Sequence, residues 1–184
     1  MNKAKILIWS FRAIMAAAVV VKICMGETGL AIYGTLAFCL TFSPELIKLF
    51  FKFEVPMGLC ITLTMFVFFA MTVAKLFYLY ELTTWWDKLL HLGSGAILAY
   101  IGALIAKTLL GDTQNVSVIL IFGFMFALSI GALWEIWEFS GDVLFGLDSQ
   151  IRETGVFDTM GDIIADAVGA GCALPFLQKW IKAK

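Results

Sequence analysis

The side chains best suited to chemistry in this chain are one histidine and a series of carboxylates. Asp87, His91 and Ser94 are spaced i, i+4 and i+7, so on a helix they share one face. His91 is the only histidine of the chain. An aspartate one turn away would orient the imidazole and select its tautomer, which suits His91 to general acid–base catalysis. The alternative is a structural histidine whose hydrogen bonds are satisfied inside the protein.

A second group of carboxylates follows the apolar run 116–133, in the segment ALWEIWEFSGD at 132–142. Glu135, Glu138 and Asp142 are spaced i, i+3 and i+7, and they also share a helix face. The neighbouring tryptophans are typical of a membrane interface, which explains Asp142 but not Glu135, because Glu135 should lie inside the apolar layer. Carboxylates this close repel one another, so we expect them to share protons, meet a cation or line a wet cavity.

Three aspartates recur every four residues in a third segment, DTMGDIIADAVGA at 158–170. A helix N-terminus favours acidic residues, which is sufficient to explain Asp158 but not Asp166, two turns farther along. Small residues form a parallel stripe that would allow this helix to pack closely against a neighbour. The stripe consists of Gly161, Ala165, Gly169 and Ala173.

If the three helix faces meet, one imidazole and several carboxylates converge on a single outward-facing site. Carboxylate oxygens suit Mg²⁺, Mn²⁺ or Ca²⁺, and the imidazole would shift the preference toward Mn²⁺, Zn²⁺ or Fe²⁺. The predicted metal ligands are Glu135, Glu138, Asp142, Asp158, Asp162 and Asp166. The predicted catalytic residues are His91, Asp87 and Glu135, and the predicted substrate-binding residues are Arg152, Ser94 and Lys88.

The composition indicates the kind of protein that must position these residues. Hydrophobic residues make up 61% of the 184 residues and charged residues 15%. Soluble domains are about 45–50% apolar and about 25% charged, so the chain is predicted to be an all-α polytopic membrane protein of one domain, 1–184. No basic run suggests a nucleic-acid partner, and membrane lipids are the expected partners. The four cysteines lack CxxC spacing, which argues against a zinc framework.

Six apolar segments are long enough to cross a bilayer, which needs about 20 residues per helix. We predict one bundle of about six transmembrane helices near 6–25, 30–50, 55–80, 89–110, 116–139 and 161–181. Pro44 and Glu45 predict a break or kink in the second. The first is expected to be a retained helix rather than a signal peptide, because Arg12 interrupts it and no clear cleavage site follows.

The distribution of basic residues predicts the orientation of the helices. Six spans place both termini on one side of the membrane, and most lysines fall on that side. They are Lys3, Lys5, Lys48, Lys52, Lys107, Lys179, Lys182 and Lys184. The positive-inside rule therefore predicts cytoplasmic termini. Most of the acidic residues gather at the opposite, outward end of the last three helices.

The polar segments also resemble those of known membrane proteins. WDKLLH at 86–91, WEIWEF at 134–139 with Asp142, and DTMGDIIADAVGA at 158–170 resemble the YjdF family of bacterial inner-membrane proteins and, more distantly, the VanZ-like superfamily. The chain departs from the pattern at Phe157 and Met160, where a tryptophan and a glutamine are expected. The resemblance implies a multi-pass protein of the bacterial cytoplasmic (inner) membrane. It points to the same histidine and acidic residues as the site.

Three functions are compatible with this pattern. The first is a metal-assisted hydrolase or transferase that acts on a lipid or polyprenyl phosphate at the outer leaflet, with Arg152 pairing with a phosphate. The second is a cation or proton-coupled transporter, which should show polar residues that continue past the middle of the membrane. The third is a non-catalytic assembly partner whose polar residues lock the bundle, and there each carboxylate should be paired within the protein.

Overall fold

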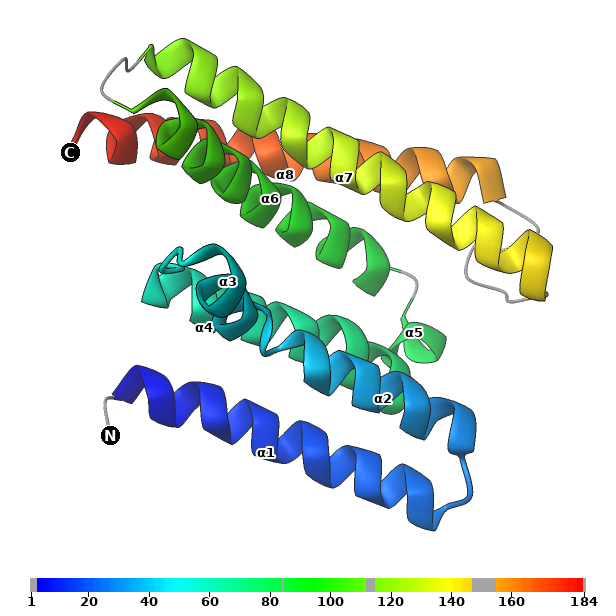
Figure 1. Cartoon of the computed structure of the whole chain (residues 1–184). Coiled ribbons are helices and arrows are strands. Elements are labelled where there is room, and N and C mark those ends of the chain that lie inside the picture. The colour runs from blue at the N-terminus through cyan, green and yellow to red at the C-terminus, as the bar shows by residue number, and fades with distance from the viewer. Residues whose placement is uncertain (1–2, 84, 112–114, 147–154, 184) are drawn as a thin grey trace. The chain divides into compact units, whose positions relative to one another are not determined.

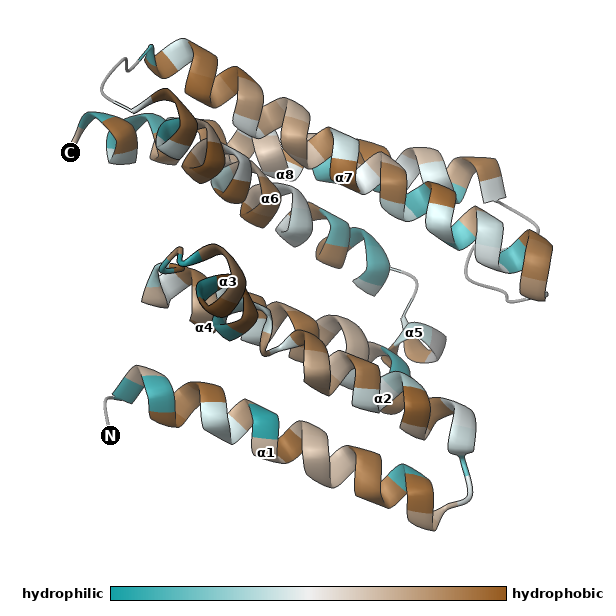
Figure 2. Ribbon diagram, in the orientation of Figure 1, coloured by the Kyte–Doolittle hydropathy of each residue, from teal (hydrophilic) through white to brown (hydrophobic). Residues whose placement is uncertain are grey.

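The computed structural model describes residues 3–83, 85–111, 115–146 and 155–183, and this part of the chain is helical with turns and short irregular connections. The chain divides into two compact units, Met1–Trp86 and Asp87–Lys184, and each is described by itself. Figure 1 shows the helices of each unit, and Figure 2 shows that hydrophobic residues predominate along them. The all-α prediction is therefore confirmed.

Five helices among the described residues are long and apolar enough to cross a membrane, or six if one bent pair is counted as a single span. In the first unit, α1 covers Lys3–Cys24, α2 Thr28–Leu40, α3 Ser43–Phe51 and α4 Met57–Val67, followed by the π-helical η1 Phe68–Leu76 and the short α5 Leu79–Leu82. In the second unit, α6 covers Trp86–Leu110, α7 Val116–Phe145 and α8 Gly155–Lys182. The prediction of about six spans is confirmed.

The second predicted span, 30–50, is the bent pair. α2 and α3 meet at an angle of 48°. Pro44 lies in the first turn of α3, where its missing N–H costs no helical hydrogen bond, so the helix restarts there instead of continuing. The predicted break is therefore present, and it falls at residues 41–42, just before the proline.

Other boundaries differ from the prediction for local reasons. The third span ends at Leu76 rather than at residue 80, because Tyr78 adopts a left-handed φ of 60° that cannot continue a helix. α7 extends six residues beyond the predicted end at residue 139, to Phe145, where Gly146 with φ 65° forms the C-cap. Its start is set by Asn115, whose side chain accepts hydrogen bonds from the N–H groups of Ser117 and Val118. α6 and α8 begin three and six residues earlier than predicted.

A buried arginine holds the break in the second span. Arg12 of α1 is 2% exposed, and its guanidinium donates to the Thr41 carbonyl oxygen at 2.6 Å and the Thr41 hydroxyl at 3.1 Å. The same group pairs with Glu45 at 2.8 Å and lies 3.8 Å from the centre of the Phe42 ring. A helix break inside an apolar layer leaves carbonyl groups without partners, and Arg12 satisfies the one at Thr41.

A second polar contact joins distant parts of the first unit. Lys22, near the end of α1, donates to Glu27 at 2.7 Å and to the Tyr78 hydroxyl at 3.1 Å, and the Tyr78 hydroxyl donates to Glu27 at 2.8 Å. The hydrogen bond from Lys22 lowers the pKa of Glu27, so the pair stays ionised near neutral pH. This contact connects the turn after α1 to Tyr78, the left-handed residue just after the third span.

Close packing in the second unit depends on small residues at four-residue spacing. The buried face of α7 is the run Ile119, Gly123, Ala127, Gly131 and Glu135. The buried residues of α6 include His91, Gly95, Ala99 and Ala103, and those of α8 include Asp162, Asp166 and Ala170. On each helix, the same face that is apolar and narrow over most of its length becomes polar at one end.

Two glycines bring α6 and α8 into backbone contact. A Cβ atom added to Gly95 would collide with the backbone carbonyl of Asp166, and one added to Gly169 would collide with that of Leu92. Small residues permit this kind of approach between membrane helices. The two contacts are reciprocal, so they fix both the spacing and the register of α6 against α8.

We expect Arg12→Met to destabilise the protein by about 1–3 kcal/mol, because the Thr41 carbonyl would lose its partner inside the apolar layer. Thermal unfolding of the purified protein in detergent measures this. Lys48→Met is the matched control, because Lys48 pairs with Glu54 and both side chains are mostly exposed. Equal effects of the two substitutions would contradict the role assigned to Arg12.

We expect Gly95→Ala to destabilise the protein by about 1–3 kcal/mol, because the new methyl group must push α6 away from α8. Gly93→Ala is the control on the same helix, since a Cβ atom there meets nothing within 4 Å. Alanine also favours a helix over glycine, so Gly93→Ala should be neutral or stabilising. Unfolding curves in which Gly95→Ala matches Gly93→Ala would show that the close approach is absent.

Candidate functional site

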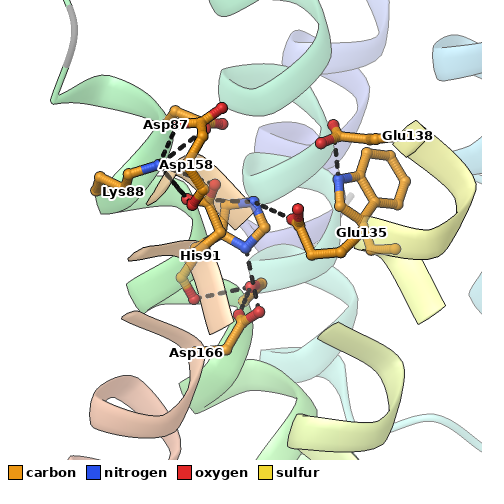
Figure 3. Close-up of polar contacts among 10 residues, drawn as sticks. Asp87, Lys88, His91, Glu135, Glu138, Asp158 and Asp166 are labelled. Atoms are coloured by element: carbon orange, nitrogen blue, oxygen red, sulfur yellow. Dashed lines mark hydrogen bonds and ion pairs between the residues drawn. The ribbon is translucent and has the colours of Figure 1, made fainter. Parts of the chain in front are cut away.

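The predicted site residues on the three helices of the second unit come together. They lie in the first turns of α6, the second half of α7 and the first half of α8. Figure 3 shows the side chains of Asp87, Lys88, His91, Glu135, Asp158 and Asp166 gathered in one place. α7 runs antiparallel to α6 and α8, so these three stretches fall at the same end of the unit (Figure 1). Residues that were predicted to share one face of each helix therefore lie together between the three helices.

His91 is held by a carboxylate from another helix. Its Nδ1 lies 3.1 Å from Asp166 Oδ2, and both residues are buried, at 7% and 1% exposure. Ser94 donates to the other Asp166 oxygen at 2.6 Å. Asp87 was expected to orient the ring, but the carboxylate within hydrogen-bonding distance of the imidazole is that of Asp166 in α8. With Nδ1 bound to a carboxylate, Nε2 is the nitrogen that faces the rest of the site.

Lys88 neutralises part of the acidic cluster. Its ammonium group donates to Asp158 Oδ1 at 2.6 Å and to both oxygens of Asp162 at 2.8 Å. It also lies 3.3 Å from the Asp158 carbonyl oxygen and 3.8 Å from Asp87 Oδ2. Like charges at Asp158 and Asp162 would repel without this amine, so Lys88 is part of what makes the cluster tolerable in an apolar helix bundle.

Glu135 brings a further carboxylate oxygen to His91. The side chain is 4% exposed, and its Oε1 has no hydrogen-bond partner among the described residues, although Thr159 is in hydrogen-bonding reach of the carboxylate. Oε1 lies 3.7 Å from His91 Nε2, and Asp162 Oδ1 lies 3.8 Å from the same nitrogen. Both separations exceed a hydrogen bond. A buried oxygen without a partner carries a free-energy cost that a cation would remove.

The geometry fits a divalent metal ion. Ligand atoms of Asp87, His91 and Asp162 lie within 4.8 Å of one another. Metal–ligand bonds of about 2.0–2.2 Å place neighbouring ligand atoms about 3–3.6 Å apart. Glu135 and Asp162 would have to approach Nε2 by a few tenths of an ångström, and the widest separation in the set of three would have to close by up to about 1 Å. The carboxylate of Asp166 on Nδ1 completes the arrangement in which a metal-ligating histidine donates its other N–H to a carboxylate.

The remaining predicted site residues lie at the edge of this cluster or beyond the described part of the chain. Glu138, half-buried, accepts a hydrogen bond from Trp134 Nε1 at 3.0 Å. Asp142, also half-buried, lies one turn farther along α7. Arg152, predicted to bind substrate, lies outside the described residues. The metal-ligand prediction for Glu138 and Asp142 therefore remains a prediction.

Two glycines that shape the site were not predicted as such. A Cβ atom on Gly131 would collide with Asp166 Oδ2, and one on Gly161 would lie 3.1 Å from Lys88 Cε. Gly131 thus leaves the space that the Asp166 carboxylate occupies next to His91. The signal was available in the four-residue spacing of Gly123, Ala127 and Gly131 ahead of Glu135.

Beyond the level of Ser94 and Asp166, the described core of this unit is apolar. It consists of Ala99, Ala103, Ala106, Ile119, Ala127, Ala170, Leu177 and Ile181. Lys107 lies near the far end, with its ammonium group 4.9 Å from the Trp180 ring centre. The polar site is thus confined to one end of the unit.

Comparison with known proteins gives a family. A protein of Thermotoga maritima named "Uncharacterized protein" is 28% identical over 128 residues, an alignment that covers 70% of this chain and 66% of the relative, slightly under two thirds of its length. No solved structure matches the chain. The family described as "Predicted membrane protein (DUF2238)" matches residues 6–183. Because this match covers nearly the whole chain, the protein belongs to that family of predicted membrane proteins.

Proposed function

We propose that the protein is a membrane-embedded, metal-dependent enzyme that hydrolyses or transfers a phosphoryl group of a lipid or polyprenyl phosphate. The observation that carries this proposal is the arrangement around His91 Nε2. The ring is fixed by Asp166 on one side, and on the other it faces Asp162 and the unpartnered oxygen of Glu135 at 3.8 and 3.7 Å. His91 Nε2, Asp87 and Asp162 would hold one divalent ion.

Each residue near the ion has a distinct role in this proposal. The ion would neutralise phosphate oxygens and activate water, the two contributions that divalent metals make to phosphoryl chemistry. Glu135 is not one of the three ligands, and its Oε1 would accept the proton of the attacking water or hydroxyl group beside the ion. Lys88 would pair with a phosphate oxygen. Asp166 and Ser94 would keep the imidazole in one tautomer and orientation.

The location of the substrate follows from the predicted orientation. If both termini are cytoplasmic, the site lies at the outer end of α6, α7 and α8, where outer-leaflet headgroups are within reach. We also propose that the protein lies in the bacterial inner membrane and is related to the YjdF family and, more distantly, to the VanZ-like superfamily, as its polar motifs suggest. Arg152, which lies between α7 and α8 in the sequence, would add a second cation for the phosphate.

The pairing of Asp158, Asp162 and Asp166 within the protein favours a second candidate, a polar lock without catalysis. Such a lock holds three helices together and needs no ligand. In such a lock, Glu135 Oε1 would pair with a protonated His91 at 3.7 Å but would have no hydrogen bond from the described residues, which is why the metal site is preferred. Transport is disfavoured, because the fully buried residues beyond Ser94 and Asp166 in the described part of the second unit are apolar, and the Lys107 amine lies apart from the acidic cluster near the far end of α6.

We expect the purified protein to bind one divalent ion per chain, measured by elemental analysis after dialysis against Mn²⁺ or Zn²⁺. His91→Ala should abolish binding, because the nitrogen ligand is lost. Asp166→Asn should weaken it about 10–100-fold, because the carboxylate behind the ligand is lost. Glu54→Gln removes an exposed carboxylate of the first unit and should change nothing. A folded protein that binds no ion under these conditions would leave the polar lock as the function.

We expect metal-dependent release of phosphate from a polyprenyl diphosphate or phosphatidic acid in proteoliposomes. Glu135→Gln should lower the rate about 10²–10⁴-fold, because the amide cannot accept the proton. Lys107→Met, a change at the far end of α6, should keep the rate. Metal binding without turnover of either substrate would separate the metal site from the proposed reaction.

A further inference from the structure

The ammonium group of Lys88 is surrounded by oxygen atoms as a bound cation would be. Asp158 Oδ1 lies at 2.6 Å, both Asp162 oxygens at 2.8 Å, and the Asp158 backbone oxygen at 3.3 Å. Asp87 Oδ2 is at 3.8 Å. Such a set of carboxylate and carbonyl oxygens is the environment that Mg²⁺, Mn²⁺ and Ca²⁺ prefer. A lysine from α6 thus occupies a position built for a cation.

This position adjoins the proposed metal site through a shared oxygen. Asp162 Oδ1 accepts a hydrogen bond from Lys88 at 2.8 Å and lies 3.8 Å from His91 Nε2. A carboxylate placed between two cation positions is the arrangement of two-metal centres, where the ions lie about 3.5–4 Å apart and together stabilise a phosphoryl group. Here one of the two positions is filled by a side chain.

We propose that Lys88 is a tethered cation that fills the second position of a two-cation centre and excludes a second divalent ion from it. This inference rests on the proposed metal site at His91. It gives Lys88 the task of a second metal ion, which is to neutralise phosphoryl charge beside the first.

Charge and space both support this assignment. Five carboxylates gather within the second unit, from Asp87, Glu135, Asp158, Asp162 and Asp166. Lys88 pairs with three of them, Asp87, Asp158 and Asp162. One divalent ion and one lysine leave the cluster anionic, so removal of the amine would increase its attraction for another cation. Gly161 provides the room for the amine, because a Cβ atom there would lie 3.1 Å from Lys88 Cε.

The test compares the number of Mn²⁺ ions bound by the wild type and by Lys88→Met, using equilibrium dialysis and elemental analysis in detergent. We expect one ion per chain in the wild type and two in Lys88→Met. Two Mn²⁺ ions that share Asp162 should also show spin coupling by electron paramagnetic resonance. The double variant Lys88→Met/His91→Ala should retain one ion, at the position vacated by the amine.

Matched variants separate charge from helix packing. Lys88→Arg keeps the positive charge and Lys107→Met removes a lysine of the same helix outside the cluster, so both should bind one ion. If Lys88→Met does not accumulate in the membrane, Lys88→Gln removes the charge but keeps a polar side chain, and it should also bind two ions. One ion in the wild type with no increase in Lys88→Met or Lys88→Gln would overturn the inference and leave the proposed metal site intact. No ion in any variant, or ions in Lys88→Met alone, would overturn the metal site itself.

Discussion

The close approach of α6 and α8 at Gly95 and Gly169 is the constraint on which the candidate site depends. Each glycine lies against a backbone carbonyl of the other helix, so neither helix can slide or rotate without a collision. In that register, His91 faces Asp166 and Ser94 faces the same carboxylate from the neighbouring turn. A looser interface would separate these groups beyond hydrogen-bonding distance, and an unpaired buried carboxylate is costly in an apolar environment.

The same principle accounts for the position of Glu135. It is the last residue of a buried face on α7, and the three buried residues before it, Gly123, Ala127 and Gly131, have little or no side chain. Narrow helix faces pack closely, and a long side chain at the end of such a face projects into the shared interior. Gly131 also leaves the space occupied by the Asp166 carboxylate. Small residues therefore perform two tasks here, since they bring the helices together and leave room for the polar groups.

Buried polar groups play different roles in the two units. In the first, Arg12 satisfies the backbone at a helix break, and Lys22, Glu27 and Tyr78 fasten a turn. Each of these groups has its partners within the unit. In the second, one oxygen of Glu135 has no hydrogen-bond partner among the described residues, and it lies 3.7 Å from His91 Nε2, with Asp162 Oδ1 at 3.8 Å from the same nitrogen. Other buried atoms without a hydrogen-bond partner in the described part of the chain, such as the Thr72 hydroxyl oxygen and the Lys107 amine, are isolated, whereas that of Glu135 lies beside the imidazole and a further carboxylate.

The sequence by itself determined the class of protein, the number of spans and the residues that share a helix face. Hydrophobic length and four-residue spacing are local properties of a chain, so 116–139 was predicted to be a helix and its carboxylates to lie on one side. Sequence signals were weaker at the helix ends, where the left-handed backbone of Tyr78 shortened one helix and the cap at Gly146 lengthened another.

Which side chains pair with one another was decided only by the tertiary structure. Spacing favoured Asp87 as the partner of His91, whereas contact between α6 and α8 brought Asp166 to the ring and Lys88 to Asp162. These pairings join residues more than 70 positions apart, and they depend on which helix faces can approach closely, which no single segment of the chain specifies.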